Sequence, residues 1–250
     1  MKKMLVPAAV ALAFSSVSGL VQAAEPETSL AYNVGAVSDY RYRGISQSRL
    51  EPALQGGVDY THKSGFYVGA WGTTIKWIKD TPGVTAGSTE LDLYGGYKAT
   101  VGGVTYDVGL LSYVYANNNY GSASAGGTKS ANTNEAYAAV TLGPVTAKYS
   151  HAYSDLFGNL DTKNSYYLDL SATFDLGNGF SLVPHVGHQK YKNLDVATYT
   201  DYSITLAKDL GKGLSASLAV VGTDADKVFY ALKDKFNGKT GAVVGLKYTF

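Results

Sequence analysis

One pattern constrains the fold of this chain more than any other: apolar and polar residues alternate with a period of two along most of its length. Val104, Tyr106 and Val108 fall on one face of a segment, for example, while Thr105 and Asp107 fall on the other. A period of two is the repeat of a β-strand, and sustained helical periodicity is absent. The expected strands cover 29–43, 53–61, 66–74, 90–98, 104–110, 133–142, 145–153, 165–175, 202–206, 214–220 and 242–250, and a twelfth carries His185.

The connections between these strands alternate strictly between short and long. The short ones are 61–65, 100–103, 143–144, 176–179 and 211–213, and the long polar ones are 44–52, 77–88, 116–132, 155–163, 191–199 and 224–240. Short periplasmic turns and longer extracellular loops, along an even number of strands, are typical of an outer-membrane barrel. The sequence therefore predicts an all-β protein, a closed antiparallel transmembrane β-barrel of twelve strands, with ten or fourteen as alternatives. A soluble β-sandwich or lipocalin-like barrel with an apolar core is the competing fold.

Composition excludes several classes of protein. The 250 residues include no cysteine, so a disulfide framework, a thiolate metal site and a cysteine nucleophile are excluded. A formal net charge of +1 gives no basic excess for binding nucleic acid. No nucleotide-binding motif and no pair of histidines at metal-ligand spacing occurs. We therefore expect no cofactor, no metal and no enzymatic activity.

The N-terminal segment predicts export. Lys2 and Lys3 precede an apolar stretch over 5–14, and small residues lead to Ala23. This is the pattern of a secretory signal peptide over 1–23, which leaves 24–250 as a single barrel domain. No later run is long and apolar enough to predict a transmembrane helix.

The C-terminal segment predicts assembly into a membrane. Gly245, Tyr248 and the terminal Phe250 resemble the signal read by the bacterial barrel-assembly machinery, with Val243 in place of its usual polar residue. Tyrosines near strand ends predict aromatic girdles in contact with outer-membrane lipid. These are Tyr40, Tyr42, Tyr60, Tyr97, Tyr113, Tyr115, Tyr149, Tyr153, Tyr166, Tyr167 and Tyr248.

The first predicted strand carries the main candidate site. Asp39, Arg41 and Arg43 occupy every second position, so they are expected on one face, which the phase of the strand assigns to the lumen. A basic ladder there could raise the occupancy of anions in a pore. Structural pairing across the interior is the alternative, and the candidate pore-lining partners are Asp59, Glu90, Asp92, Glu135 and Asp169.

The stretch that contains these residues resembles a known family. Residues 38–48, SDYRYRGISQS, and the following 52–57 resemble the signature of the TorF family, a proteobacterial family of porin-like proteins long described as conserved hypothetical. The Tyr- and Gly-rich body and the aromatic terminus extend the resemblance over nearly all of the mature chain. The resemblance implies an outer-membrane porin and no particular solute.

Together these patterns predict passive passage of small polar solutes or ions across the bacterial outer membrane. Barrels of about eight strands are filled by side chains and those of about sixteen leave a wide channel, so twelve predict a narrow lumen. A non-conducting structural or adhesive barrel is one alternative. The other is an outer-membrane lipid hydrolase, for which His151 with a neighbouring serine is the candidate. The oligomeric state is left open.

Overall fold

The structure is a computed structural model that describes residues 27–123 and 130–250. The predicted signal peptide over 1–23 lies outside these residues and stays a prediction. In chain order the barrel strands are β1 (Thr28–Val37), β4 (Ala53–His62), β5 (Phe66–Thr74), β6 (Thr89–Val101), β7 (Val104–Val114), β8 (Thr133–Leu142), β9 (Val145–Ala152), β10 (Tyr166–Ala172), β11 (Phe174–Gly177), β12 (Phe180–Lys190), β13 (Tyr199–Gly211), β14 (Leu214–Thr223) and β17 (Gly241–Thr249).

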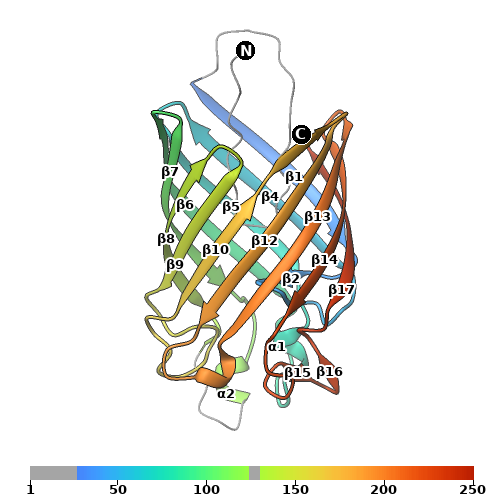
Figure 1. The fold of residues 1–250 in the computed structure, drawn as a ribbon. Coiled ribbons are helices and arrows are strands. Elements are labelled where there is room, and N and C mark those ends of the chain that lie inside the picture. The colour runs from blue at the N-terminus through green and yellow to red at the C-terminus, as the bar shows by residue number, and fades with distance from the viewer. Residues whose placement is uncertain (1–26, 124–129) are drawn as a thin grey trace.

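These strands form one closed antiparallel barrel (Figure 1). Each strand pairs with its neighbours in the sequence, and β1 pairs with β17 to close the sheet. β10 and β11 both pair with β12 and share one position, so the 13-stranded sheet is a barrel of twelve. The predicted fold and strand number are confirmed.

The eighth position of the barrel is interrupted at Thr173, within the single strand predicted over 165–175. The register that pairs Ser171 with His185 and Phe174 with Leu182 brings Pro184 opposite Ala172, directly before the interruption. Proline has no N–H to donate to the ladder, so the hydrogen bonding fails there and resumes beyond it.

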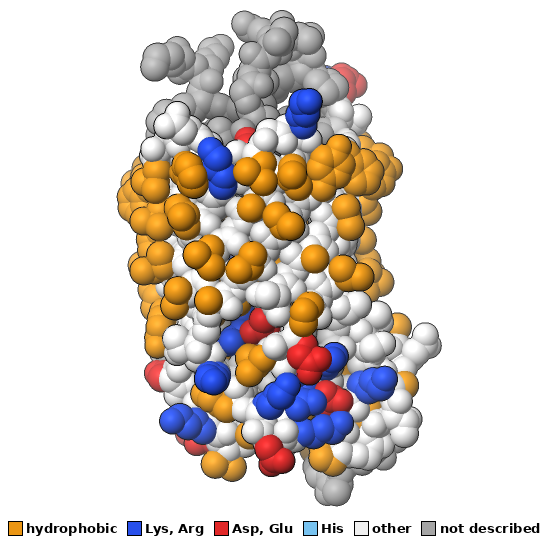
Figure 2. All heavy atoms as spheres, turned by 90° about the vertical axis from the view of Figure 1, so that its right-hand side faces the viewer, with side chains coloured by type: hydrophobic (Ala, Val, Ile, Leu, Met, Phe, Trp, Pro, Cys, Tyr) orange, Lys and Arg blue, Asp and Glu red, His pale blue; other side chains and the backbone are white. Residues whose placement is uncertain are grey.

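The outer surface of the barrel is apolar. Val108 and Leu110 are 52% and 56% exposed, whereas Asp107 between them is 7% exposed. Most outward positions of the other strands are likewise apolar, and Figure 2 shows the apolar side chains as a broad band across the face in view. A soluble barrel would have the opposite polarity, so the competing fold is wrong. No helix within 27–123 or 130–250 is both long and apolar enough to span a bilayer.

The two ends of the barrel differ as the sequence predicts. Tight turns join strands at one end, such as Asn178 and Gly179 with φ of 52° and 76°, and the long loops lie at the other (Figure 1). We number these extracellular loops 1 (38–52), 2 (75–88), 3 (115–132), 4 (153–165), 5 (191–198) and 6 (224–240). They carry β2 (Arg41–Tyr42), β3 (Ile45–Ser46), α1 (Trp77–Asp80), α2 (Tyr120–Ala123), the 3-10 helix η1 (Asp195–Ala197), β15 (Ala231–Leu232) and β16 (Lys235–Phe236).

Tyrosine and glycine act together on the inner face. A Cβ atom on any of four glycines would come within 2.5 Å of a tyrosine side chain on a neighbouring strand, so only glycine leaves room for the ring. The pairs are Gly69 with Tyr94, Gly96 with Tyr67, Gly109 with Tyr137 and Gly187 with Tyr167. The rings therefore pack against the barrel wall.

The predicted tyrosine girdles are only partly correct. Tyr60, Tyr97, Tyr149, Tyr153 and Tyr248 are exposed on the outside. Tyr40, Tyr113, Tyr115 and Tyr167 are instead buried inside, where Tyr42 hydrogen-bonds to Tyr113. Tyr113 and Tyr167 have the parity of lumenal residues. Tyr40 and Tyr42 instead have the outward parity of Tyr32 in β1, and they lie inside because the chain turns inward after Val37.

Candidate functional site

Loop 1 folds into the barrel as a small hairpin. The predicted strand over 29–43 is wrong beyond Val37, where β1 ends, because the chain then turns inward through β2 and β3. Arg41 pairs with Ser46 and Tyr42 with Ile45. Arg43 and Gly44 form the tip with φ of 46° and 79°, the positive pair that a tight two-residue hairpin turn requires.

Arg43 anchors the hairpin tip to the far side of the lumen. Its guanidinium donates to both carboxylate oxygens of Glu135 on β8, at 3.0 and 2.7 Å, and to Oε1 of Gln189 on β12 at 2.6 Å. The guanidinium also lies 4.3 Å from the ring centroid of Tyr167. Both side chains of this bidentate ion pair are buried. The pair therefore fixes the position and the orientation of the hairpin tip.

Gly44 lets the tip approach the wall on a second side. A Cβ atom at this position would lie 2.5 Å from Cβ of Asp201 on β13. The positive φ and the close contact both require glycine. The hairpin therefore reaches β8, β12 and β13, and it narrows the extracellular half of the barrel.

Asp39 and Arg41 hold the base of the hairpin rather than standing free in the lumen. They form an ion pair in which both side chains are buried, and Oγ of Ser46 donates to Asp39 at 2.5 Å. Nη1 of Arg41 donates to the carbonyl of Gly44 at 3.0 Å, which stabilises the turn. The three residues predicted to form one ladder therefore act as two separate ion pairs.

Two carboxylates beside the hairpin have no basic partner in the described structure. Glu90 and Asp92 lie on the inner face of β6, 3% and 4% exposed. Tyr40 donates to Glu90 at 2.7 Å, while Oδ1 of Asp92 is buried without a hydrogen-bond partner. Burying a charge without compensation is costly, so these two carboxylates form an unbalanced acidic site beside the hairpin.

The remaining predicted residues lie deeper in the lumen. Asp59 accepts a hydrogen bond from the hydroxyl of Tyr94. Asp169 lies 2.7 Å from Nε2 of His185, whose Nδ1 is 3.6 Å from Asp201. All eight predicted pore-lining residues therefore face the interior, most of them in ion pairs or hydrogen bonds distributed along it, while Asp92 leaves one oxygen without a partner.

Sequence reasoning missed part of the lumenal network. Asp107 lies 3.3 Å from Nζ of Lys98 and accepts from the hydroxyl of Tyr67 at 2.6 Å. Lys148 lies over the ring of Tyr137, and Lys247 shares the inward parity of Val243. The signal was available, because each is at an inward position of an alternating strand. Across the described lumen, carboxylates outnumber basic side chains.

A comparison with protein families identifies the chain's relatives. Residues 21–250 match the family model described as "Bacterial protein of unknown function (Gcw_chp)". The chain belongs to the Gcw_chp family. No curated protein matches it.

Solved structures show that the Gcw_chp barrel is similar to outer-membrane porins. The NanC porin aligns with a TM-score of 0.55 and 11% identity over 89% of this chain and 99% of NanC. The KdgM porin aligns with a TM-score of 0.54 and 9% identity over 88% and 98%. An outer membrane channel from Pseudomonas putida F1 aligns with a TM-score of 0.52 and 14% identity over 90% and 96%. The closed barrel and its apolar band place the Gcw_chp protein in the bacterial outer membrane.

His151 does not form the arrangement expected of a hydrolase. It lies on the outer face, with Nδ1 3.0 Å from the hydroxyl of Tyr149 and Nε2 3.2 Å from Oδ1 of Asn164. Both nitrogens have partners other than serine, and Ser150 is buried on the opposite face of the strand. Among the described residues, no cluster of three His, Cys, Asp or Glu side chains could hold a metal ion.

Proposed function

We propose that this Gcw_chp protein is a porin-like channel for passive diffusion of small polar or ionic solutes through a narrow, charged lumen. The observation that carries the proposal is the polarity of the barrel, with charged side chains inside an apolar outer band. The porin folds of NanC and KdgM support it, and KdgM has also been solved with disordered oligogalacturonate. The solute of this chain is not assigned by those likenesses.

The charges of the described lumen favour cations, because its carboxylates outnumber its basic side chains even with Lys148 and Lys247 counted. Arg41 and Arg43, the residues of the predicted basic ladder, are each neutralised by a carboxylate. Glu90 and Asp92 stand near the narrowed region without a basic partner. Anionic side chains lining a pore raise the local concentration of cations, so we propose a modest cation preference.

One observation supports a non-conducting barrel as a second candidate. The hairpin tip bridges the lumen through Arg43, Glu135 and Gln189, and such contacts could close the barrel rather than narrow it. A closed barrel would serve a structural or adhesive role through its loops.

Planar-bilayer recording distinguishes these functions. The purified barrel is expected to give discrete conductance steps, with a reversal potential on the cation side in a KCl gradient. The Arg41→Ala/Arg43→Ala variant is expected to conduct more and to remain cation-preferring. Absence of any conductance in both proteins would contradict the channel and support the structural barrel.

Export and assembly belong to the same proposal. We propose that 1–23 is removed as a signal peptide, so the mature protein should begin at Ala24 on N-terminal sequencing. Gly245, Tyr248 and Phe250 are proposed to be read by the barrel-assembly machinery; Phe250 stacks on Tyr32 with ring centroids 5.8 Å apart. We propose in addition that the chain is related to the TorF family, on the likeness of residues 38–48 and 52–57 to its signature.

A further inference from the structure

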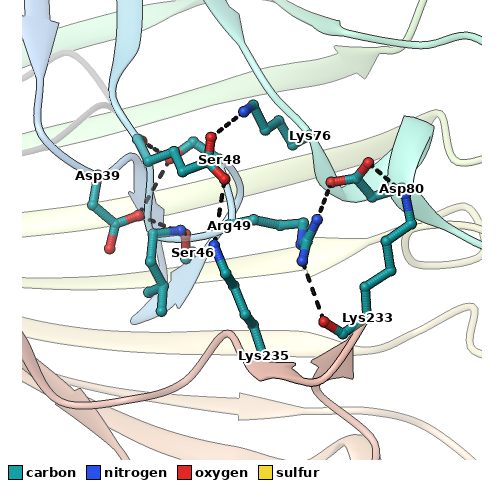
Figure 3. A network of polar contacts seen from close by, with 10 residues as sticks. Asp39, Ser46, Ser48, Arg49, Lys76, Asp80, Lys233 and Lys235 are labelled. Atoms are coloured by element: carbon teal, nitrogen blue, oxygen red, sulfur yellow. Dashed lines mark hydrogen bonds and ion pairs between the residues drawn. The ribbon is translucent and has the colours of Figure 1, made fainter.

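Loops 1, 2 and 6 are joined outside the lumen by a group of charged side chains. We call it the rim cluster, and its members are Arg49, Glu51, Lys76, Asp80, Lys233 and Lys235. Figure 3 shows side chains from the three loops converging on one another. The cluster is separate from the hairpin tip and from the carboxylates of the lumen.

Each carboxylate of the rim cluster is held between two cations. Asp80 accepts from Nη1 of Arg49 at 2.5 Å and from Nζ of Lys233 at 2.9 Å. Glu51 pairs with Lys76 and lies 3.4 Å from Nζ of Lys235. The carboxylates therefore fix the positions of ammonium groups that would otherwise be mobile.

The rim cluster keeps a positive charge after this pairing, because four cations share two carboxylates. The side chains of Lys76, Lys233 and Lys235 are 45%, 53% and 44% exposed, so their remaining N–H donors are available to a ligand. Each ammonium group has three N–H donors, and within the cluster it donates one hydrogen bond to a carboxylate. Loops 4 and 5, counted together with Lys190, have equal numbers of acidic and basic side chains. The excess of positive charge therefore belongs to the rim cluster and not to those loops.

The rim cluster lies at the border of the apolar band. Leu54, which faces outward at the start of β4 and is 66% exposed, follows Glu51 by three residues, a span of at most about 10 Å. Figure 2 shows charged side chains gathered directly below the apolar band on the face that carries β14 and β17. In an outer membrane, this level is occupied by the headgroups of the outer leaflet.

We propose that the rim cluster binds the phosphate groups of the phosphorylated glycolipid that forms the outer leaflet, with Lys76, Lys233 and Lys235 as the donors. Phosphate is a strong acceptor for several ammonium donors at once. Fixed lysines lose less side-chain freedom on binding than mobile ones. Because the rim cluster lies at the border of the apolar band, a lipid whose acyl chains contact that band would have its phosphate groups beside the three lysines.

The test titrates the detergent-solubilised full barrel with bisphosphorylated lipid A and measures bound lipid by native mass spectrometry. The Lys76→Gln/Lys233→Gln/Lys235→Gln variant is expected to bind at least about tenfold more weakly than wild type. Lys163→Gln/Lys190→Gln/Lys192→Gln removes the same charge from loop 4, the end of β12 and loop 5, and is expected to bind like wild type. A heat-modifiable gel shift in both variants verifies that the barrels are folded.

Two further arms define the ligand. Lipid A from which both phosphates have been removed is expected to lose the binding that depends on the three lysines, and inorganic phosphate at millimolar concentration is expected to compete weakly. Equal binding by the two lysine variants, or by the phosphate-free lipid, would overturn the proposal. Complete displacement by inorganic phosphate would overturn the lipid as its source. Neither the lipid binding nor the phosphate competition depends on conductance. Failure of the channel proposal would therefore leave the proposal for the rim cluster unaffected.

Discussion

Arg43 and Glu135 are 92 positions apart in the sequence, yet Nη2 of the arginine lies 2.7 Å from Oε2 of the carboxylate inside the barrel. This ion pair joins the tip of loop 1 to β8 across the lumen. Both side chains are less than a tenth exposed, so solvent screens their attraction weakly. The pair converts a surface loop into an internal constriction.

Breaking this pair should both destabilise the barrel and widen its lumen. Arg43→Met leaves Glu135 buried without a basic partner, which typically costs about 3–5 kcal/mol, whereas Arg43→Met/Glu135→Gln should cost less than the sum of the single changes. Urea unfolding in lipid vesicles measures the cycle, and single-channel conductance of Arg43→Met should rise. Additive costs would show that the two residues do not interact as described.

Gly44 should be intolerant of any side chain. Gly44→Ala adds a Cβ that lies 2.5 Å from Asp201 and carries the cost of a positive φ, so we expect a loss of more than about 1 kcal/mol. Gly103→Ala is the matched control, since Gly103 has φ of 83° and nothing within 4 Å of its added Cβ. Both variants carry the cost of a positive φ, but only Gly44→Ala adds a steric clash. The difference between their free energies of unfolding therefore measures the clash. Equal losses would argue against the close contact at Asp201.

The sequence predicts the barrel well because period-two alternation and turn length are local properties. Most strands have their charged residues on the inner face, and the break at Thr173 adjoins the position where Pro184 of the partner strand lies opposite Ala172. The sequence alone does not tell which residue of the neighbouring strand lies opposite Pro184. The position of this break therefore could not be predicted.

The hairpin of loop 1 could not be predicted from alternation. Residues 37–43 continue the period of β1, and only the Arg43–Gly44 pair signals a turn. That the turn enters the lumen depends on Glu135, Gln189 and Asp201, which come from three distant strands. These contacts are properties of the closed barrel, so the inward direction of the loop is visible only in the structure.

The joined loops should loosen in acid. Burial opposes ionisation of Asp80, but hydrogen bonds from Arg49 and Lys233 outweigh it and lower the pKa of this carboxyl. A hydrogen bond from Lys76 is the main cause that lowers the pKa of Glu51. With pKa values lower in the folded loops than in free ones, the stabilisation is complete above about pH 4 and is lost as the pH falls through the lowered values.

Hydrogen exchange of loops 1, 2 and 6 measures this effect. Protection should be constant from neutral pH to about pH 4 after correction for the intrinsic exchange rate, and should fall below it. Asp80→Asn should show reduced protection already at neutral pH, while loops 4 and 5 stay unchanged. Equal loss of protection in all loops at low pH would point to general unfolding instead.

Glu90 and Asp92 should set the ion preference of the lumen. In water, two unit charges about 10 Å from a permeating ion contribute about 0.8 kcal/mol, or about fourfold in cation occupancy at low salt, and less when screened. Glu90→Gln/Asp92→Asn should lower the cation-to-anion permeability ratio by up to this factor in reversal-potential measurements. Asp161→Asn/Asp195→Asn removes the same charge from exposed loop positions and should change the ratio much less. An unchanged ratio in the first variant, with conductance intact, would remove these two carboxylates from selectivity.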